Sequence, residues 1–127
     1  MTSTIALVFV GGGLGSVLRL LLSQWLTPVE WDKAGPPFPY GTLAVNLIGC
    51  LVIGLAAGWC GRRDWTRSFL LIGVLGGFTT FSTFGLDTAR MLLAGHAGRA
   101  FLYVGLSVLG GLAATVIAMR FAAPPMD

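Results

Sequence analysis

Residues 68–93 read SFLLIGVLGGFTTFSTFGLDTARMLL, an apolar run in which charge is confined to Asp87 and Arg90 near its end. About 20 apolar residues are needed to cross the roughly 30 Å of hydrocarbon in a bilayer. This run is therefore long enough to span a membrane as a helix. Its centre joins paired glycines to a cluster of hydroxyl and phenyl side chains, a composition that lipid contact alone does not explain.

Three further apolar runs lie around it, at residues 5–26, 40–59 and 100–122. The chain has 127 residues, of which 55% are hydrophobic and only 10% charged, whereas soluble domains carry about 25% charged residues. Because a span in lipid must satisfy its own backbone hydrogen bonds, runs of this length are expected to be helices. We therefore predict an all-α membrane protein of four transmembrane helices, forming a single domain over residues 1–127.

The eight Lys and Arg residues divide evenly between the two sides of the predicted membrane. One side would hold Arg62, Arg63, Arg67 and Arg120, and the other Arg19, Lys33, Arg90 and Arg99. The positive-inside rule needs an excess on one side to fix orientation. Two interpretations stay open: a single orientation set by the cluster at residues 62–67, or insertion both ways followed by assembly as an antiparallel pair. Since these cations flank the spans, we interpret the net charge of +3 as membrane-edge anchoring and not as nucleic-acid binding.

Glycines recur four residues apart within the predicted spans. The pairs are Gly11 with Gly15, Gly54 with Gly58, and Gly73 with Gly77. In lipid, helices associate through close backbone contact, which small residues at this spacing permit. The pattern predicts tightly packed helix pairs.

The middle of the third predicted span is expected to be broken. Gly76 and Gly77 each weaken a helix by about 1 kcal/mol relative to alanine, and the β-branched Thr79 and Thr80 follow at once. A break at membrane depth frees backbone carbonyls, which is tolerated only where protein or an ion satisfies them. Broken helices near the midplane hold ions in several transporter folds.

Polar side chains share single faces of the predicted helices. Helical spacing aligns Thr42, Asn46 and Gly49 on the second span and Tyr103, Ser107 and Gly111 on the fourth, while residues 79–84 of the third combine four hydroxyls with Phe81 and Phe84. Hydrogen bonds between helices suffice to explain an isolated Ser or Thr, but an amide brings two donors and an acceptor that need partners. Hydroxyl and amide donors, with the positive edge of a phenyl ring, can replace the water around a small anion.

Titratable groups are scarce inside the predicted spans. His96 falls in the third loop, and Asp87 lies three residues from Arg90, which offers it an ordinary ion pair. Arg19 either reaches toward the interface or lends positive potential to a vestibule that draws anions in. The sequence contains no nucleophile beside a base and no metal-ligand cluster, so we predict that the protein is not an enzyme.

Three segments carry longer motifs: GGLG at residues 12–15 followed by Arg19, GTLAVNLIG at residues 41–49, and GVLGGFTTFSTF at residues 73–84. Together they resemble the CrcB/Fluc family of small fluoride channels, and the resemblance covers the whole chain. It implies an antiparallel, dual-topology homodimer with two pores that conduct fluoride passively. It also implies a multi-pass protein of the bacterial inner membrane that protects the cell against fluoride, with lipid, fluoride and a second copy as partners and no nucleic acid.

The same resemblance assigns roles to individual residues. The pore would be lined by an amide, two phenyl rings and several hydroxyls, namely Asn46, Phe81, Phe84, Thr83, Ser107, Tyr103 and Thr42. Arg19 would stand at the vestibule. A structural sodium ion at the dimer interface would be held by the backbone carbonyls of Gly76 and Thr79 from both subunits.

Two other functions stay open. A small dual-topology exporter coupled to protons would use Asp87 as its carrier and would depend on a pH gradient. A structural subunit of a larger complex would show no flux on its own. The sequence assigns no further role to the loop at residues 27–39 beyond capping a vestibule.

Overall fold

The computed structural model describes residues 2–27, 35–59 and 64–122. Lys33, Arg62 and Arg63, which enter the predicted charge balance, lie outside these residues, as does most of the loop at 27–39. The regular elements are helical: α1 (Thr2–Leu26), α2 (Tyr40–Trp59), α3 (Asp64–Thr66), the π-helix η1 (Arg67–Leu75), α4 (Gly76–Phe78), α5 (Phe81–Leu93) and α6 (Ala97–Ala122).

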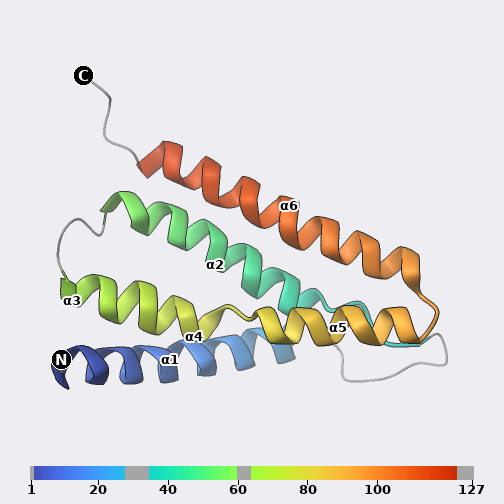
Figure 1. The fold of residues 1–127 in the computed structure, drawn as a ribbon, viewed down its shortest axis with the longest axis horizontal. Helices are drawn as coiled ribbons and strands as arrows, with labels where there is room; N and C mark the ends of the chain where they lie inside the picture. The colour runs from blue at the N-terminus through green and yellow to red at the C-terminus, as the bar shows by residue number, and fades with distance from the viewer. Residues whose placement is uncertain (1, 28–34, 60–63, 123–127) are drawn as a thin grey trace.

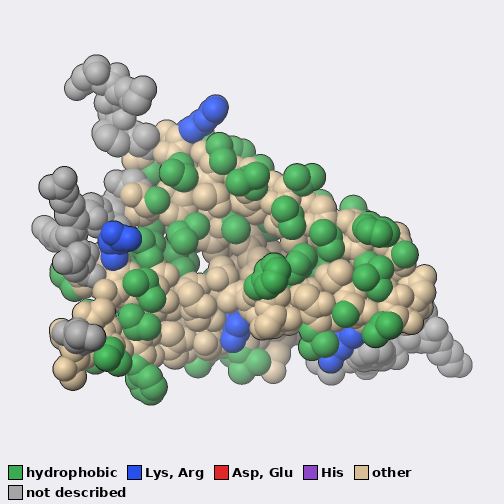
Figure 2. Space-filling model, in the orientation of Figure 1, with side chains coloured by type: hydrophobic (Ala, Val, Ile, Leu, Met, Phe, Trp, Pro, Cys, Tyr) green, Lys and Arg blue, Asp and Glu red, His purple; other side chains and the backbone are tan. Residues whose placement is uncertain are grey.

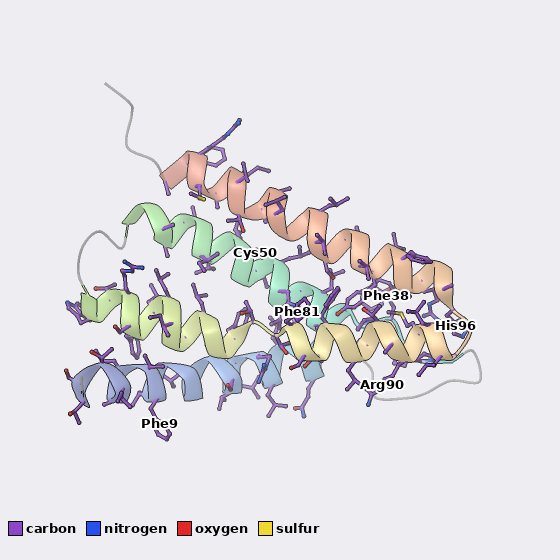
Figure 3. All side chains as sticks on the ribbon, viewed as in Figure 1. Phe9, Phe38, Cys50, Phe81, Arg90 and His96 are labelled. Carbon is purple, nitrogen blue, oxygen red and sulfur yellow. The ribbon has the colours of Figure 1, made fainter. Side chains whose placement is uncertain are left out.

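Four segments are long and apolar enough to cross a membrane: Thr2–Leu26, Tyr40–Ala57, Arg67–Leu93 and Ala97–Ala122. The predicted all-helical architecture with four spanning helices is therefore confirmed. Large apolar side chains lie exposed along these helices, and Phe9 points away from the bundle in Figure 3. Figure 2 shows such side chains over the whole visible face, which suits a protein solvated by lipid.

The helices form two packed pairs (Figure 1). α1 lies beside η1 and α4, α2 lies along α6, and α5 continues the direction of α4. The start of α1 and the end of α6 lie at the same end of the bundle. At the other end, the carbonyl of His96 accepts the N–H of Ala100 (3.1 Å), so that α6 begins at Ala97, ahead of the predicted start at residue 100.

Glycine contacts bring α1 against η1 and α4. A Cβ on Gly11 would lie 2.5 Å from the carbonyl oxygen of Phe69, and a Cβ on Gly15 would overlap the carbonyl oxygen of Val74. From the facing side, a Cβ on Gly77 would overlap the carbonyl oxygen of Gly12. The close packing predicted from glycine spacing is thus confirmed between these elements, whose backbones touch directly.

The second pair is held by small residues and one threonine. A Cβ on Gly54 of α2 would lie 2.6 Å from the carbonyl oxygen of Thr115 on α6. The Thr115 hydroxyl contacts the carbonyl of Cys50 on α2 (3.1 Å) and that of Gly111 on its own helix (3.0 Å). Further toward the α5–α6 turn lies a small apolar core of Phe38, Met91, Ala100 and Tyr103.

Candidate functional site

The chain leaves the helical conformation between α4 and α5. Thr79 (φ −78°, ψ 155°) and Thr80 (φ −148°, ψ 119°) are extended and form the uncoiled link visible in Figure 1. Asn46 of α2 pairs with this link: its Nδ2 donates to the Thr80 carbonyl oxygen (3.1 Å), and its Oδ1 accepts the Thr80 N–H (2.9 Å). The Asn46 side chain therefore satisfies both the N–H and the carbonyl of Thr80. In a continuous helix, these two groups would pair with other backbone groups.

The side chain of Thr80 starts α5. Its Oγ1 accepts the N–H of Thr83 (3.2 Å), which is an N-cap hydrogen bond. The same hydroxyl donates to the Thr83 hydroxyl (3.0 Å) and lies 3.3 Å from that of Ser82. Three hydroxyls thus gather at the N-terminus of α5, the positive end of the helix dipole.

Two backbone carbonyls lose the donors that a continuous helix would give them. In an α-helix the carbonyl of residue i accepts the N–H of residue i+4. The Thr80 N–H, which would serve Gly76, is donated to Asn46, and the Thr83 N–H, which would serve Thr79, is donated to the Thr80 hydroxyl. The oxygens of Gly76 and Thr79 therefore suit a hard cation, which prefers oxygen ligands.

A pocket of about 370 Å³ opens beside the link, between α2, η1, α5 and α6. The molecule is visibly hollowed there in Figure 2. Its lining joins polar groups of the link to apolar side chains: Asn46, Gly49, Cys50, Ile53, Leu71, Leu75, Gly76, Thr79, Thr80, Phe81, Phe84, Ser107 and Val108. Within the described residues this lining carries no Asp, Glu, His, Lys or Arg, so an ion in the pocket would meet no charged side chain but amide, hydroxyl and ring-edge groups.

A row of aromatic rings leads away from this pocket. Phe81, at the start of α5 in Figure 3, lies 5.5 Å from Phe84 between ring centroids, and Phe84 lies 5.3 Å from Tyr103. Phe38 meets Tyr103 edge-on at 5.7 Å. Phe81 is 83% exposed whereas Tyr103 is fully buried, so the row runs from the open side of the bundle into its interior.

Two buried hydroxyls beside this row have no hydrogen-bond partner among the described residues. They are Tyr103 Oη and Ser107 Oγ, and Tyr103 has Thr42, Asp87 and Ser107 as polar neighbours. Leaving a buried polar group unpaired costs about 1–3 kcal/mol. Each hydroxyl therefore has a donor to offer to a ligand that enters the row.

A second pocket has a volume of about 300 Å³. Its polar lining comes from Thr42, Thr83, Asp87 and Arg90, together with residues of α1 and the segment before α2. The Thr42 hydroxyl donates to Asp87 Oδ2 (2.9 Å). Arg90 lies 3.9 Å from Asp87 Oδ1, so the predicted ion pair is present. Thr83 joins the two pockets because it also bonds to Thr80.

The predicted pore and sodium-site residues lie in the two pockets and in the aromatic row. The first pocket is lined by Asn46, Phe81, Phe84, Ser107, Gly76 and Thr79, the second by Thr42 and Thr83, and Tyr103 packs against Phe84. Arg19 lies half-buried on α1 and lines neither pocket.

Sequence reasoning gave no separate role to two residues that shape the link, Thr80 and Ser16. Ser16 of α1 donates to the carbonyl oxygen of Gly77 (3.4 Å). A Thr just ahead of a helical run is an N-cap signal that could have identified Thr80. Ser16 carries no such signal, because its contact depends on how α1 crosses α4.

The chain is similar to a known family over nearly its whole length. The profile of the family described as CrcB-like protein, Camphor Resistance (CrcB), matches residues 6–119. A Pseudomonas fluorescens protein named Fluoride-specific ion channel FluC is 46% identical over 119 residues, covering 91% of this chain and 93% of the relative. Proteins of the same name from Azotobacter vinelandii (47% identity, 85% and 87% covered) and Novosphingobium aromaticivorans (44%, 88% and 89%) are also similar.

Proposed function

The chain belongs to the CrcB-like protein family, which is a family of ion channels and not of enzymes, and on this premise we propose that it conducts fluoride selectively out of the cytoplasm. The observation that carries the proposal is the set of hydrogen-bond donors and ring edges that line the first pocket and the aromatic row beside it. Relatives at 44–47% identity are named fluoride-specific channels, which supports fluoride as the ion.

The chemistry of the path suits a small, strongly hydrated anion. An ion leaving water needs groups that replace its hydration shell, and the unpaired hydroxyls of Tyr103 and Ser107 are such donors. Asn46 uses one N–H of its amide on Thr80, which leaves the second for a ligand. The edges of Phe81 and Phe84 carry partial positive charge and complete the shell.

The proposed functional unit is an antiparallel homodimer with two pores. The first pocket opens to the outside of the single chain, and Phe81 on its rim is largely exposed. A second copy packed there would close the pocket. The even division of Lys and Arg in the sequence supports insertion in both orientations.

A structural sodium ion would lie between the two copies, at the point where the third span is interrupted. This point would lie near the middle of the membrane. The carbonyls of Gly76 and Thr79 from each copy would hold it, because both have lost their helical donors to Asn46 and Thr80. When bound, the ion supplies the positive charge that such carbonyls need at membrane depth.

Passive conduction is sufficient for protection against fluoride in the inner membrane of a bacterium. Hydrogen fluoride crosses lipid uncharged and dissociates in a less acidic cytoplasm, which traps the anion. The inside-negative potential then drives fluoride outward with about 2.3 kcal/mol per charge per 100 mV. No proton carrier is needed, and Asp87 is already engaged by Thr42 and Arg90.

Fluoride efflux from liposomes that contain only the purified chain tests the proposal. With equal pH on both sides, fluoride efflux should begin when a potassium ionophore is added, because potassium then leaves with fluoride and the charge stays balanced. The protein should not pass chloride under the same conditions. Chloride passing as readily as fluoride would contradict selective conduction. Efflux that needs a pH gradient and is abolished by Asp87→Asn would favour the proton-coupled exporter, and absence of flux would favour a structural subunit.

A further inference from the structure

The uncoiled link is built by side chains as much as by the glycines before it. Gly76 and Gly77 themselves have helical conformation as part of α4. The extended residues are Thr79 and Thr80, and two of the four N–H groups that would bridge the link in a continuous helix, those of Thr80 and Thr83, go to side-chain acceptors instead. Asn46 and Thr80 therefore compete directly with the backbone for those donors.

Removal of either acceptor returns a donor to the helix. Without the Thr80 hydroxyl, the nearest helical acceptor of the Thr83 N–H is the Thr79 carbonyl. Without Asn46 Oδ1, the corresponding acceptor of the Thr80 N–H is the Gly76 carbonyl. In both cases a carbonyl whose helical donor is diverted in the present structure would regain that donor.

We propose that Asn46 and Thr80 are positioning residues for the bound cation, because they divert two amide donors and so leave the Gly76 and Thr79 carbonyls available as ligands. The inference rests on the sodium site of the proposed function and deepens it. Gly77 lies between Gly76 and Thr79 in the chain, but its carbonyl accepts a hydrogen bond from the Ser16 hydroxyl of α1. This carbonyl is therefore not counted among the cation ligands.

The arrangement couples the cation site to the ion path through one side chain. The two hydrogen bonds to Thr80 fix which end of the Asn46 amide is oxygen and which is nitrogen. They also hold this amide in the wall of the first pocket. A cation that stabilises the extended link thereby keeps the Asn46 donor in place for the anion.

Sodium titration of the purified full-length protein tests this role without measuring flux. Thermal unfolding followed by tryptophan fluorescence would be recorded in detergent as sodium replaces N-methyl-D-glucamine. We expect Thr80→Val to raise the half-saturating sodium concentration about 10- to 100-fold, the range typical of residues that orient metal ligands. Thr80→Ser should restore it, because serine keeps the hydroxyl.

Thr88→Val is the matched control, since the Thr88 hydroxyl donates to the Phe84 carbonyl of its own helix (2.8 Å) and does not touch the link. It should leave sodium affinity unchanged. Asn46→Leu is a second, independent variant, and its sodium affinity should fall as that of Thr80→Val does. Wild-type sodium affinity in either folded variant would overturn the proposal.

The result is separable from the proposed function. If the wild type shows no stabilisation by sodium but passes fluoride in the liposome assay, the positioning role is wrong and fluoride conduction stands. If the sodium response depends on Thr80 and Asn46 as expected but no fluoride passes, the positioning role stands and fluoride conduction is wrong.

Discussion

Substitution of Gly15 by alanine tests the contact between α1 and the helical segment before the link. Gly15 faces backbone atoms of η1 and α4: an added Cβ would overlap the carbonyl oxygen of Val74 and lie 2.8 Å from the amide nitrogen of Phe78. Gly13 lies two residues earlier on the same helix, and none of the described residues comes within 4 Å of a Cβ added there. The two substitutions are chemically identical and lie on the same helix, so they differ in what the added Cβ contacts.

The expected difference follows from two opposing effects. Replacing glycine by alanine inside a helix is favourable by about 0.8–1.0 kcal/mol, and Gly13→Ala should gain this in full. Gly15→Ala should lose about 1–3 kcal/mol to overpacking, because the obstructing atoms belong to a backbone that cannot rotate away. Because the propensity gain is common to both variants, they should differ by the overpacking cost of about 1–3 kcal/mol, which for a chain of this size corresponds to about 4–12 °C in midpoint.

Thermal unfolding of both variants in one detergent measures this difference, with tryptophan fluorescence as the signal. Gly13→Ala should unfold at or above the wild-type midpoint, and Gly15→Ala below that of Gly13→Ala. Fluoride efflux should fall with Gly15→Ala, since Phe78 directly precedes the link. Unfolding of Gly15→Ala within about 2 °C of Gly13→Ala would refute the backbone-contact reasoning.

Three other substitutions separate packing from conduction. Phe81→Ala should leave the unfolding midpoint nearly unchanged, because the ring is 83% exposed. Loss of a ring contact worth about 0.5–1.5 kcal/mol should nevertheless slow fluoride efflux about 2- to 13-fold. Asp87→Asn should retain efflux at equal pH on both sides, since conduction needs no proton carrier, and efflux lost under this condition would contradict the channel. Thr115→Val should cost about 0.6–1.7 kcal/mol in thermal unfolding, because it removes the contact with the Cys50 carbonyl of α2; Thr88→Val, whose hydroxyl bonds only its own helix, is the control.

The four spanning helices could be predicted because lipid leaves a long apolar run few alternatives to a helix. Finer features could not be read in the same way. The π-helix η1 differs from an α-helix only in which carbonyl each N–H reaches, and the apolar pattern of residues 67–75 is compatible with both. Glycine spacing indicated close contacts, but that Gly11 and Gly15 meet η1 and α4 is a property of the assembled bundle.

The candidate site was predictable in its residue types and less so in its connections. Asn46 was recognised because a buried amide needs several partners, yet nothing local indicates that its partner is the backbone of Thr80. The hydroxyl and phenyl cluster at residues 79–84 was visible as composition. Tyr103 and Ser107 were recognised from their spacing on one helix face, but that their hydroxyls stay unpaired among the described residues depends on how the helices pack and was visible only in the fold.

The link lies where two packed helix pairs meet, and each pair is stabilised by different contacts. α1, η1 and α4 touch backbone to backbone through glycine, and α2 packs along α6 through Gly54 and Thr115. Asn46 connects these pairs at the link by two hydrogen bonds to Thr80. A substitution at a packing glycine therefore disturbs stability and conduction together. A substitution at Phe81, which projects from the link without filling a core, should disturb conduction alone, and this separation is what distinguishes an ion path from a structural cavity.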